Sequence, residues 1–331
     1  MTQHYHLAVS TMLALASFSA TLNGQDLRRG LIEADLIAVG RQVHKEELTP
    51  DLALHRLQIV ELLRGGKSDL TSVTVLDWPK LSMHNRPMPR QTRIYCLQDA
   101  TSAATRAGLP ADKGPYFKMV GWAGTNPLVG ADLDKDAAVR FARLLAGAEA
   151  GLEATGMVDA LLDTALTGTP EIRTEAAQFL SERPDLRARI NALQWTRVLA
   201  RVTGEVDDVT YKIALAELCA EQRLPGLPEA LVLGVSAVPQ ANYLRTVGRL
   251  LAILQGEQAT ATLMAQVQIA RDPKHREALL LALGATQTQS ALDTLLNLRR
   301  SLGTDKVVEA ALVEHHSRAA RDAVLQGKKD K

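Results

Sequence analysis

The second half of the chain contains the stretch Asp272-Pro-Lys-His-Arg-Glu-Ala-Leu-Leu-Leu-Ala-Leu283. A proline and a charged cluster at its start, followed by alanines and leucines, are typical of the first turns of a buried helix. The stretch Glu171-Ile-Arg-Thr-Glu-Ala-Ala-Gln-Phe-Leu180 has a similar order. Pro239 to Gln268 also lines up with Pro273 to Arg300 at an offset of about 32–34 residues, which is the length of a helical-hairpin repeat. We therefore predict repeated helical hairpins in this half.

Apolar residues elsewhere in this half follow the same period. Val247, Leu250, Leu251 and Leu254 are spaced by three and four residues, as one face of a helix requires. Glycines and prolines divide such stripes into segments. From about residue 134 onward, the pattern predicts roughly ten or eleven helices of about 10–16 residues. An irregular helical bundle would show the same stripes and is the alternative.

The first half has a different pattern, because short runs rich in branched and aromatic residues replace the helical stripes. Glycine- and proline-containing turns such as Thr49-Pro50-Asp51 and Gly65-Gly66 separate these runs. Short strands with this punctuation are typical of a small barrel or sandwich. The expected strands lie within residues 34–43, 57–62, 72–76, 93–97 and 116–122.

The helical half resembles HEAT-like repeats, whose first helix often opens with Pro-x-x-Arg-x-x-Ala-Ala. Thr169-Pro170…Arg173-Thr-Glu-Ala-Ala177 keeps that pattern, and Asp272-Pro273…Arg276-Glu-Ala278 keeps part of it. The resemblance covers residues from about 155 to 315 and implies a solenoid of stacked hairpins. It concerns the fold and assigns no activity.

The first half resembles the OB-type barrels of exported bacterial proteins, which are similar to the netrin/tissue-inhibitor-of-metalloproteinases group. The residues that carry this resemblance are Ala34-Asp-Leu-Ile-Ala-Val-Gly-Arg-Gln-Val43, Leu57-Gln-Ile-Val-Glu-Leu-Leu-Arg-Gly65 and Thr92-Arg-Ile-Tyr-Cys-Leu97. Protease inhibition in that group depends on a cysteine at the mature N-terminus. No cysteine stands near Thr21, so this activity is not carried over.

The fold class that we predict is α+β multidomain, with a small OB-like β-barrel followed by a HEAT-like helical solenoid. The expected parts are a signal peptide at residues 1–20, the barrel domain at 21–130 and the helical repeat domain at 131–331. The signal peptide rests on the uncharged run from Leu7 to Phe18, whose length suits a secretory segment. The alternative is a frayed or buried N-terminal helix. Export to the periplasm or the medium is the expectation that follows.

Composition excludes several classes of protein. The chain has 331 residues, 46% of them hydrophobic, which is too apolar for intrinsic disorder. Its 38 Lys and Arg against 37 Asp and Glu leave a net charge of +1, whereas a nucleic-acid binder normally has a basic surplus. Cys96 and Cys219 are about 120 residues apart and could pair. Burial of both as small hydrophobes is the interpretation that we favour.

Three motifs suggest ligand sites but fail in detail. Gly65-Gly66-Lys67-Ser68 lacks the earlier glycine of a phosphate-binding loop and is better explained as a hairpin turn. Asp132, Asp134 and Asp136 have the spacing of a calcium loop without its glycine and glutamate, so we expect them to cap a helix running from about Asp134 to Ala150. His315-His316 cannot chelate one ion from a helix, and a solvated helix end is expected there.

Imidazoles and carboxylates in the first half offer the remaining chemistry. Asp77 and Trp78 lie close in sequence to His84, and His44 and His55 could face each other across a hairpin. No nucleophile motif accompanies them. We therefore name no catalytic, cofactor-binding or metal-binding residue, and we expect no cofactor.

The function that these patterns favour is an exported, non-enzymatic binding or scaffold protein, with a helical-repeat surface for a protein or peptide partner. No nucleic acid and no membrane span are expected. The alternative is an extracytoplasmic hydrolase with a site between barrel and helices, which would require His84 and Asp77, or His44 and His55, to converge. The sequence leaves the partner, the cleavage point and the oligomeric state open.

Overall fold

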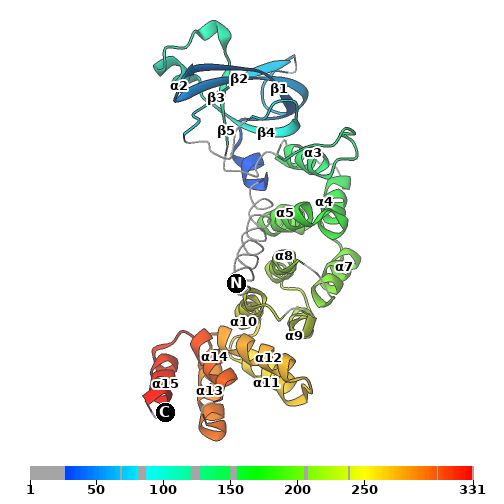
Figure 1. Cartoon of the computed structure of the whole chain (residues 1–331). Helices are drawn as coiled ribbons and strands as arrows, with labels where there is room; N and C mark the ends of the chain where they lie inside the picture. Colours follow the sequence, from blue (N-terminus) through cyan, green and yellow to red (C-terminus); the bar gives the residue numbers. More distant parts are fainter. Residues whose placement is uncertain are drawn as a thin grey trace, which may run out of the picture. The chain divides into compact units, whose positions relative to one another are not determined.

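The protein consists of a five-stranded β-barrel followed by a series of helices, as the predicted α+β class requires (Figure 1). The computed structural model describes residues 27–67, 69–80, 87–120, 127–149, 155–204, 208–237, 239–303 and 305–329. The predicted signal peptide at residues 1–20 lies outside this set. The chain forms two compact units that divide between Phe179 and Leu180, and each is considered by itself.

The barrel closes in the order β1-β2-β3-β5-β4, with β4 pairing back to β1. The strands are β1 Leu36–Thr49, β2 Leu52–Arg64, β3 Ser72–Asp77, β4 Thr92–Asp99 and β5 Tyr116–Met119. Neighbouring strands are antiparallel except β3 and β5, which are parallel. Because successive side chains point to opposite faces, one set fills the interior. That set includes Leu36, Ala38, Leu57, Val73, Val75, Tyr95, Leu97 and Phe117.

The two halves of β1 differ in burial. The first five residues of β1 are buried, whereas all seven from Val43 to Thr49 are exposed. The pairing of β1 with β2 shifts register at several points, one of them between Gln42 and His44. Each such shift changes which residues of the two strands lie opposite each other. The second half of β1 is therefore exposed to solvent, although the strand begins in the core.

Among the described residues, thirteen helices follow the barrel, somewhat more than the ten or eleven predicted, and all but two have the predicted length of about 10–16 residues. Beyond the short α2 (Thr101–Arg106), which lies between β4 and β5, they are α3 Ala137–Glu149, α4 Thr155–Thr167, α5 Pro170–Glu182, α6 Pro184–Arg187, α7 Ala192–Thr203, α8 Val209–Glu221, α9 Leu227–Ala237, α10 Ala241–Gln255, α11 Gln258–Ile269, α12 Pro273–Ala285, α13 Gln289–Leu302, α14 Lys306–Glu314 and α15 Arg318–Lys329.

Helices α7 to α15 stack as hairpins in two layers within the second unit. In the first layer, α8 contacts α10, α10 contacts α12, and α12 contacts α14. In the second layer, α7 contacts α9, α11 contacts α13, and α13 contacts α15. Helix α10 begins at Ala241 and α12 at Pro273, an offset of 32 residues that falls in the predicted range. The repeated helical hairpins are confirmed.

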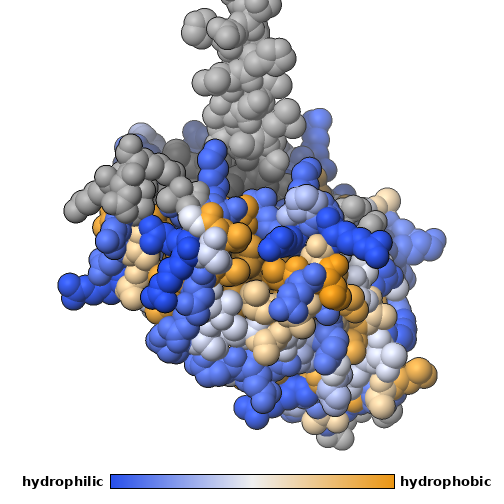
Figure 2. All heavy atoms as spheres, turned by 90° about the horizontal axis from the view of Figure 1, so that it is seen from below, coloured by the Kyte–Doolittle hydropathy of each residue, from blue (hydrophilic) through white to orange (hydrophobic). Residues whose placement is uncertain are grey.

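Figure 2 shows the molecule from the end at which α13 and α15 lie in Figure 1. Hydrophobic residues gather on this face in orange areas, and hydrophilic residues, drawn in blue, surround and interrupt them. The helical unit therefore leaves part of its apolar surface in contact with solvent, a property that bears on its function below.

Two glycines allow the first-layer helices to approach closely. A Cβ atom on Gly248 of α10 would collide with the carbonyl oxygen of Ala282 in α12. A Cβ atom on Gly284 of α12 would collide with the carbonyl oxygen of Ala311 in α14. Backbone atoms cannot swing away as a flexible side chain can. A hydrogen atom is therefore the only substituent that fits at either position without moving a helix.

We expect Gly284→Ala to lower the free energy of unfolding by about 1–3 kcal/mol, because α12 and α14 must separate to admit the methyl group. Urea unfolding followed by circular dichroism measures the change. Gly156→Ala in α4 is the matched control, since no neighbouring atom lies within 4 Å of its added Cβ. Equal stability of the Gly284→Ala protein and the wild type would show that the helix contact is loose.

Candidate functional site

A row of polar side chains crosses three strands on the outside of the barrel. His44 of β1 lies opposite Arg56 of β2, and Arg56 lies opposite Thr74 of β3. Leu57 and Val73, which are next to this row in sequence, point into the core. Strand alternation therefore directs Arg56 and Thr74 outward.

This row lies in a groove of about 390 Å³, a volume within the range of small-ligand sites. We call it the barrel groove, and it is lined by His44, Glu46, Leu54, Arg56, Ser72, Val73, Thr74, Lys113, Gly114 and Pro115. Two permanent cations, one carboxylate, two hydroxyls and a few apolar side chains thus surround one hollow. Such a mixture suits recognition of a polar ligand better than burial of an apolar one.

Lys113, Gly114 and Pro115 form one wall of the barrel groove, and hydrogen bonds hold the segment from Pro110 to Pro115 in place. The Thr74 hydroxyl donates to the carbonyl oxygen of Lys113 at 3.3 Å. The Tyr116 hydroxyl donates to the carbonyl oxygen of Pro110 at 2.8 Å, and its ring is buried beneath this segment. The wall is therefore fixed against β3, which positions Lys113 beside the row.

The prediction that His44 and His55 face each other is wrong. His44 lies opposite Arg56, whereas His55 lies opposite Lys45, because the register shift after Gln42 moves the pairing by one residue. His44 is exposed on the outer face, and His55 is buried. The other predicted partner, His84, lies outside the described residues.

His55 instead meets Asp77. The Nε2 atom of His55 lies 3.1 Å from Oδ2 of Asp77, and the two residues are 2% and 3% exposed. Among the described residues, Nδ1 of His55 has no hydrogen-bond partner. The register explains the contact, since His55 and Asp77 lie opposite Val75 and Ala53, two positions apart on the same inner face. A pair so shielded from solvent is suited to stabilising the barrel rather than to contacting a substrate.

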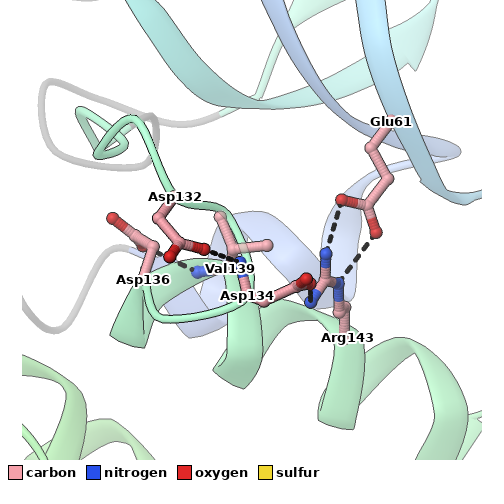
Figure 3. A network of polar contacts seen from close by, with 6 residues as sticks. All are labelled: Glu61, Asp132, Asp134, Asp136, Val139 and Arg143. Carbon is pink, nitrogen blue, oxygen red and sulfur yellow. Dashed lines mark hydrogen bonds and ion pairs between the residues drawn. The ribbon is translucent and has the colours of Figure 1, made fainter.

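The three aspartates of the calcium-like motif have structural roles (Figure 3). Oδ1 of Asp136 accepts hydrogen bonds from the backbone N–H groups of Ala138 and Val139, both at 3.0 Å, so Asp136 caps α3 as predicted. The helix begins at Ala137 rather than at Asp134. In the part of the chain that the structure describes, no group of three or more His, Cys, Asp or Glu residues could hold a metal ion.

Arg143 connects this helix to the barrel. Its Nε and Nη2 atoms donate to the two carboxylate oxygens of Glu61 on β2, both at 2.8 Å, and Nη1 donates to Asp134 at 2.9 Å (Figure 3). The hydrogen bond to Glu61 is the main cause that raises the pKa of Arg143. A bidentate contact of this kind fixes the orientation of the two side chains as well as the distance between them. Helix α3 is thereby tied to the outer face of β2.

Two other motifs have the following outcomes. Gly65 and Gly66 adopt left-handed backbone angles after β2, with φ of 75° and 72°, as expected of a turn rather than a phosphate-binding loop. The solvated helix end predicted at His315-His316 is wrong for His315, which is 4% exposed and has Nε2 2.9 Å from the carbonyl oxygen of Thr288. His316 is exposed.

Both cysteines are free and buried, so the favoured interpretation of Cys96 and Cys219 is confirmed. Cys96 lies in β4, within the barrel, and Cys219 lies in α8. Burial raises the pKa of each thiol to about 12. Because the thiolate is the reactive form, neither cysteine is suited to redox chemistry or nucleophilic attack at neutral pH.

We expect neither thiol to react with iodoacetamide at pH 8 in the folded protein, since pH 8 is far below both pKa values. Mass spectrometry after a timed exposure measures the alkylation. The control is the same protein in guanidinium chloride, where both cysteines should be alkylated. A single adduct in the folded protein would reveal an opening of one unit that burial does not suggest.

Comparison with known protein families, curated proteins and solved structures finds no match to this chain. Within the described residues, no helix is both long enough and apolar enough to cross a membrane.

Proposed function

We propose that the protein is an exported, non-enzymatic binding or scaffold protein, which uses the second-layer helices of its HEAT-like repeats to hold a protein or peptide partner. Stacked hairpins bury their apolar stripes against one another and leave an extended surface on each layer. The resemblance of the barrel to the netrin/tissue-inhibitor-of-metalloproteinases group is consistent with a location outside the cytoplasm.

The observation that carries this proposal is a series of exposed apolar side chains on the second layer. Every second-layer helix from α7 to α15 carries one large apolar side chain that is between 54% and 74% exposed. A single exposed leucine is ordinary in a soluble protein, but here one such side chain occurs on each helix of the layer. The series consists of Leu193, Leu233, Ile269, Leu302 and Leu325.

The first layer has a different character. Arg245 of α10 makes two hydrogen bonds of 2.7 Å with Glu314 of α14, and Arg249 of α10 pairs with Glu217 of α8. These charges compensate each other within the chain. Among the described residues of the first layer, large apolar side chains are exposed on α10 and α14, as Ile253 and Val313. The second layer is therefore the better candidate for a partner.

The hydrolase alternative has weaker support. It requires an imidazole and a carboxylate that a substrate can reach. The structure pairs His55 with Asp77, but both residues are almost fully shielded from solvent. His44, the accessible imidazole of the barrel groove, has its closest register neighbour in Arg56 rather than in a carboxylate.

We expect a photoreactive residue at Leu233 or Ile269 to form covalent adducts with a peptide or protein when the exported fraction is irradiated, because a bound partner would cover these side chains. Leu233→p-benzoylphenylalanine and Ile269→p-benzoylphenylalanine are the test proteins, and gel shifts with mass spectrometry of the adducts provide the measurement.

The matched control is Val313→p-benzoylphenylalanine on first-layer helix α14, where the replaced side chain is 52% exposed. The proposal requires the same adduct from both second-layer positions and none from Val313. Equal labelling at all three positions, or no adduct at Leu233 and Ile269, would refute the second-layer surface as the binding face.

The proposed export has its own test. Residues 1–30 fused to alkaline phosphatase should give phosphatase activity, because this enzyme is active only after export and oxidation. Leu13→Arg places a charge in the apolar run and should abolish the activity. Mass spectrometry should find a mature N-terminus close to Thr21. Retention of residues 1–20 in a cytoplasmic protein would contradict export.

A further inference from the structure

We infer that the barrel groove binds a peptide segment that presents a carboxylate to Arg56 and Lys113. This site lies on the barrel and is separate from the helical surface proposed above. The inference rests on an unused cation, on the neighbours of that cation and on what the lining of the groove excludes.

Arg56 differs from the other arginines of the barrel strands. Arg41 donates to the side chain of Gln58 at 3.0 and 2.9 Å, and Arg93 donates to the side chain of Gln91 at 3.1 and 2.8 Å. Arg64 donates to the carbonyl oxygen of Ala34. The guanidinium of Arg56 has no hydrogen bond or ion pair with any described residue, although it lies at the centre of the cross-strand row.

Lys113 adds a second cation to the same groove. Its backbone carbonyl is held by Thr74, while its ammonium group has no ion pair with a described residue. A planar guanidinium and a flexible ammonium group facing one hollow can share a single carboxylate. The backbone contact places Lys113 before the ligand arrives, which reduces the ordering that binding requires.

The remaining lining suits a peptide. The hydroxyls of Ser72 and Thr74 can accept hydrogen bonds from peptide N–H groups, and the exposed Pro115 provides apolar surface for an aliphatic side chain. A groove with several such contacts can hold an extended segment of a few residues. A bare inorganic anion would leave the hydroxyls and the apolar surface unused.

Glu46 makes a polyanion a poor occupant. Its carboxylate belongs to the same lining, so a chain of phosphates would lie against a like charge. None of the ten lining residues is a phenylalanine, tyrosine or tryptophan, so a nucleic acid base would lack the usual stacking platform. A peptide with one well-placed carboxylate avoids both problems, and its N–H groups can donate to Glu46.

Amide NMR of the isotopically labelled full chain tests this inference. The probe is acetyl-Ala-Gln-Val-Glu-Ala-amide, and its counterpart has glutamine in place of the glutamate. We expect the glutamate peptide to shift the backbone amide signals of Arg56, Thr74 and Lys113. The glutamine peptide should bind at least about tenfold more weakly, because it lacks the charge that the two cations recognise.

Two variants locate the binding. Arg56→Gln should weaken binding of the glutamate peptide by about tenfold. Lys118→Gln is the matched control, because it removes the same charge from an exposed position on β5 that does not line the groove, and it should change the affinity less than about twofold. Thermal melting of both variants checks that the barrel is intact.

Four outcomes would overturn the inference: equal affinity for both peptides, shifts confined to other surfaces, no effect of Arg56→Gln, and equal competition by inorganic phosphate, which would indicate a simple anion site. Tighter binding of a single-stranded oligonucleotide would reassign the groove to nucleic acid. None of these results depends on the cross-linking at Leu233 and Ile269, so the two proposals can fail separately.

Discussion

The backbone contacts at Gly248 and Gly284 determine how the helical unit is built. Where a glycine hydrogen meets a carbonyl oxygen of the next helix, the first-layer helices α10, α12 and α14 can pack with little side-chain material between them. Hairpins that share such a layer must place their second helices on its other side. The apolar side chains that the first layer does not cover then remain on α7, α9, α11, α13 and α15. The proposed binding surface is thus a consequence of tight packing elsewhere.

Barrel closure places an equally strong constraint on the first unit. The parallel pairing of β3 with β5 and the return of β4 to β1 close the barrel. Alternation along β2 places Leu57 in the core and Arg56 beside it on the outer face, so the same strand supplies both stability and the charge of the groove.

Much of this architecture follows from local patterns, because side-chain period and turn residues act over short distances. The strands, the helical hairpins and the capping role of Asp136 are of this kind. The predictions that were wrong concern contacts that depend on strand register or on the packing of segments distant in sequence. The shift after Gln42 separates His44 from His55, Asp77 meets His55 from a different strand, and His315 is buried because its ring reaches Thr288 at the start of α13. The groove depends on Lys113, which is 39 residues from Thr74, so strand pattern alone did not reveal it.

Charge pairing distinguishes structural cations from available ones in this chain. Arg143 is engaged by Glu61 and Asp134, and Arg245 by Glu314, so these side chains already have their partners. Releasing them for a ligand would cost the contacts that position α3 or join α10 to α14. Arg56 has no such contact with a described residue, so binding a ligand would not require one to be broken. The apolar series on the helices offers contact area without directional hydrogen bonds. The barrel groove is small, but its charged groups and hydroxyls can fix the orientation of a ligand.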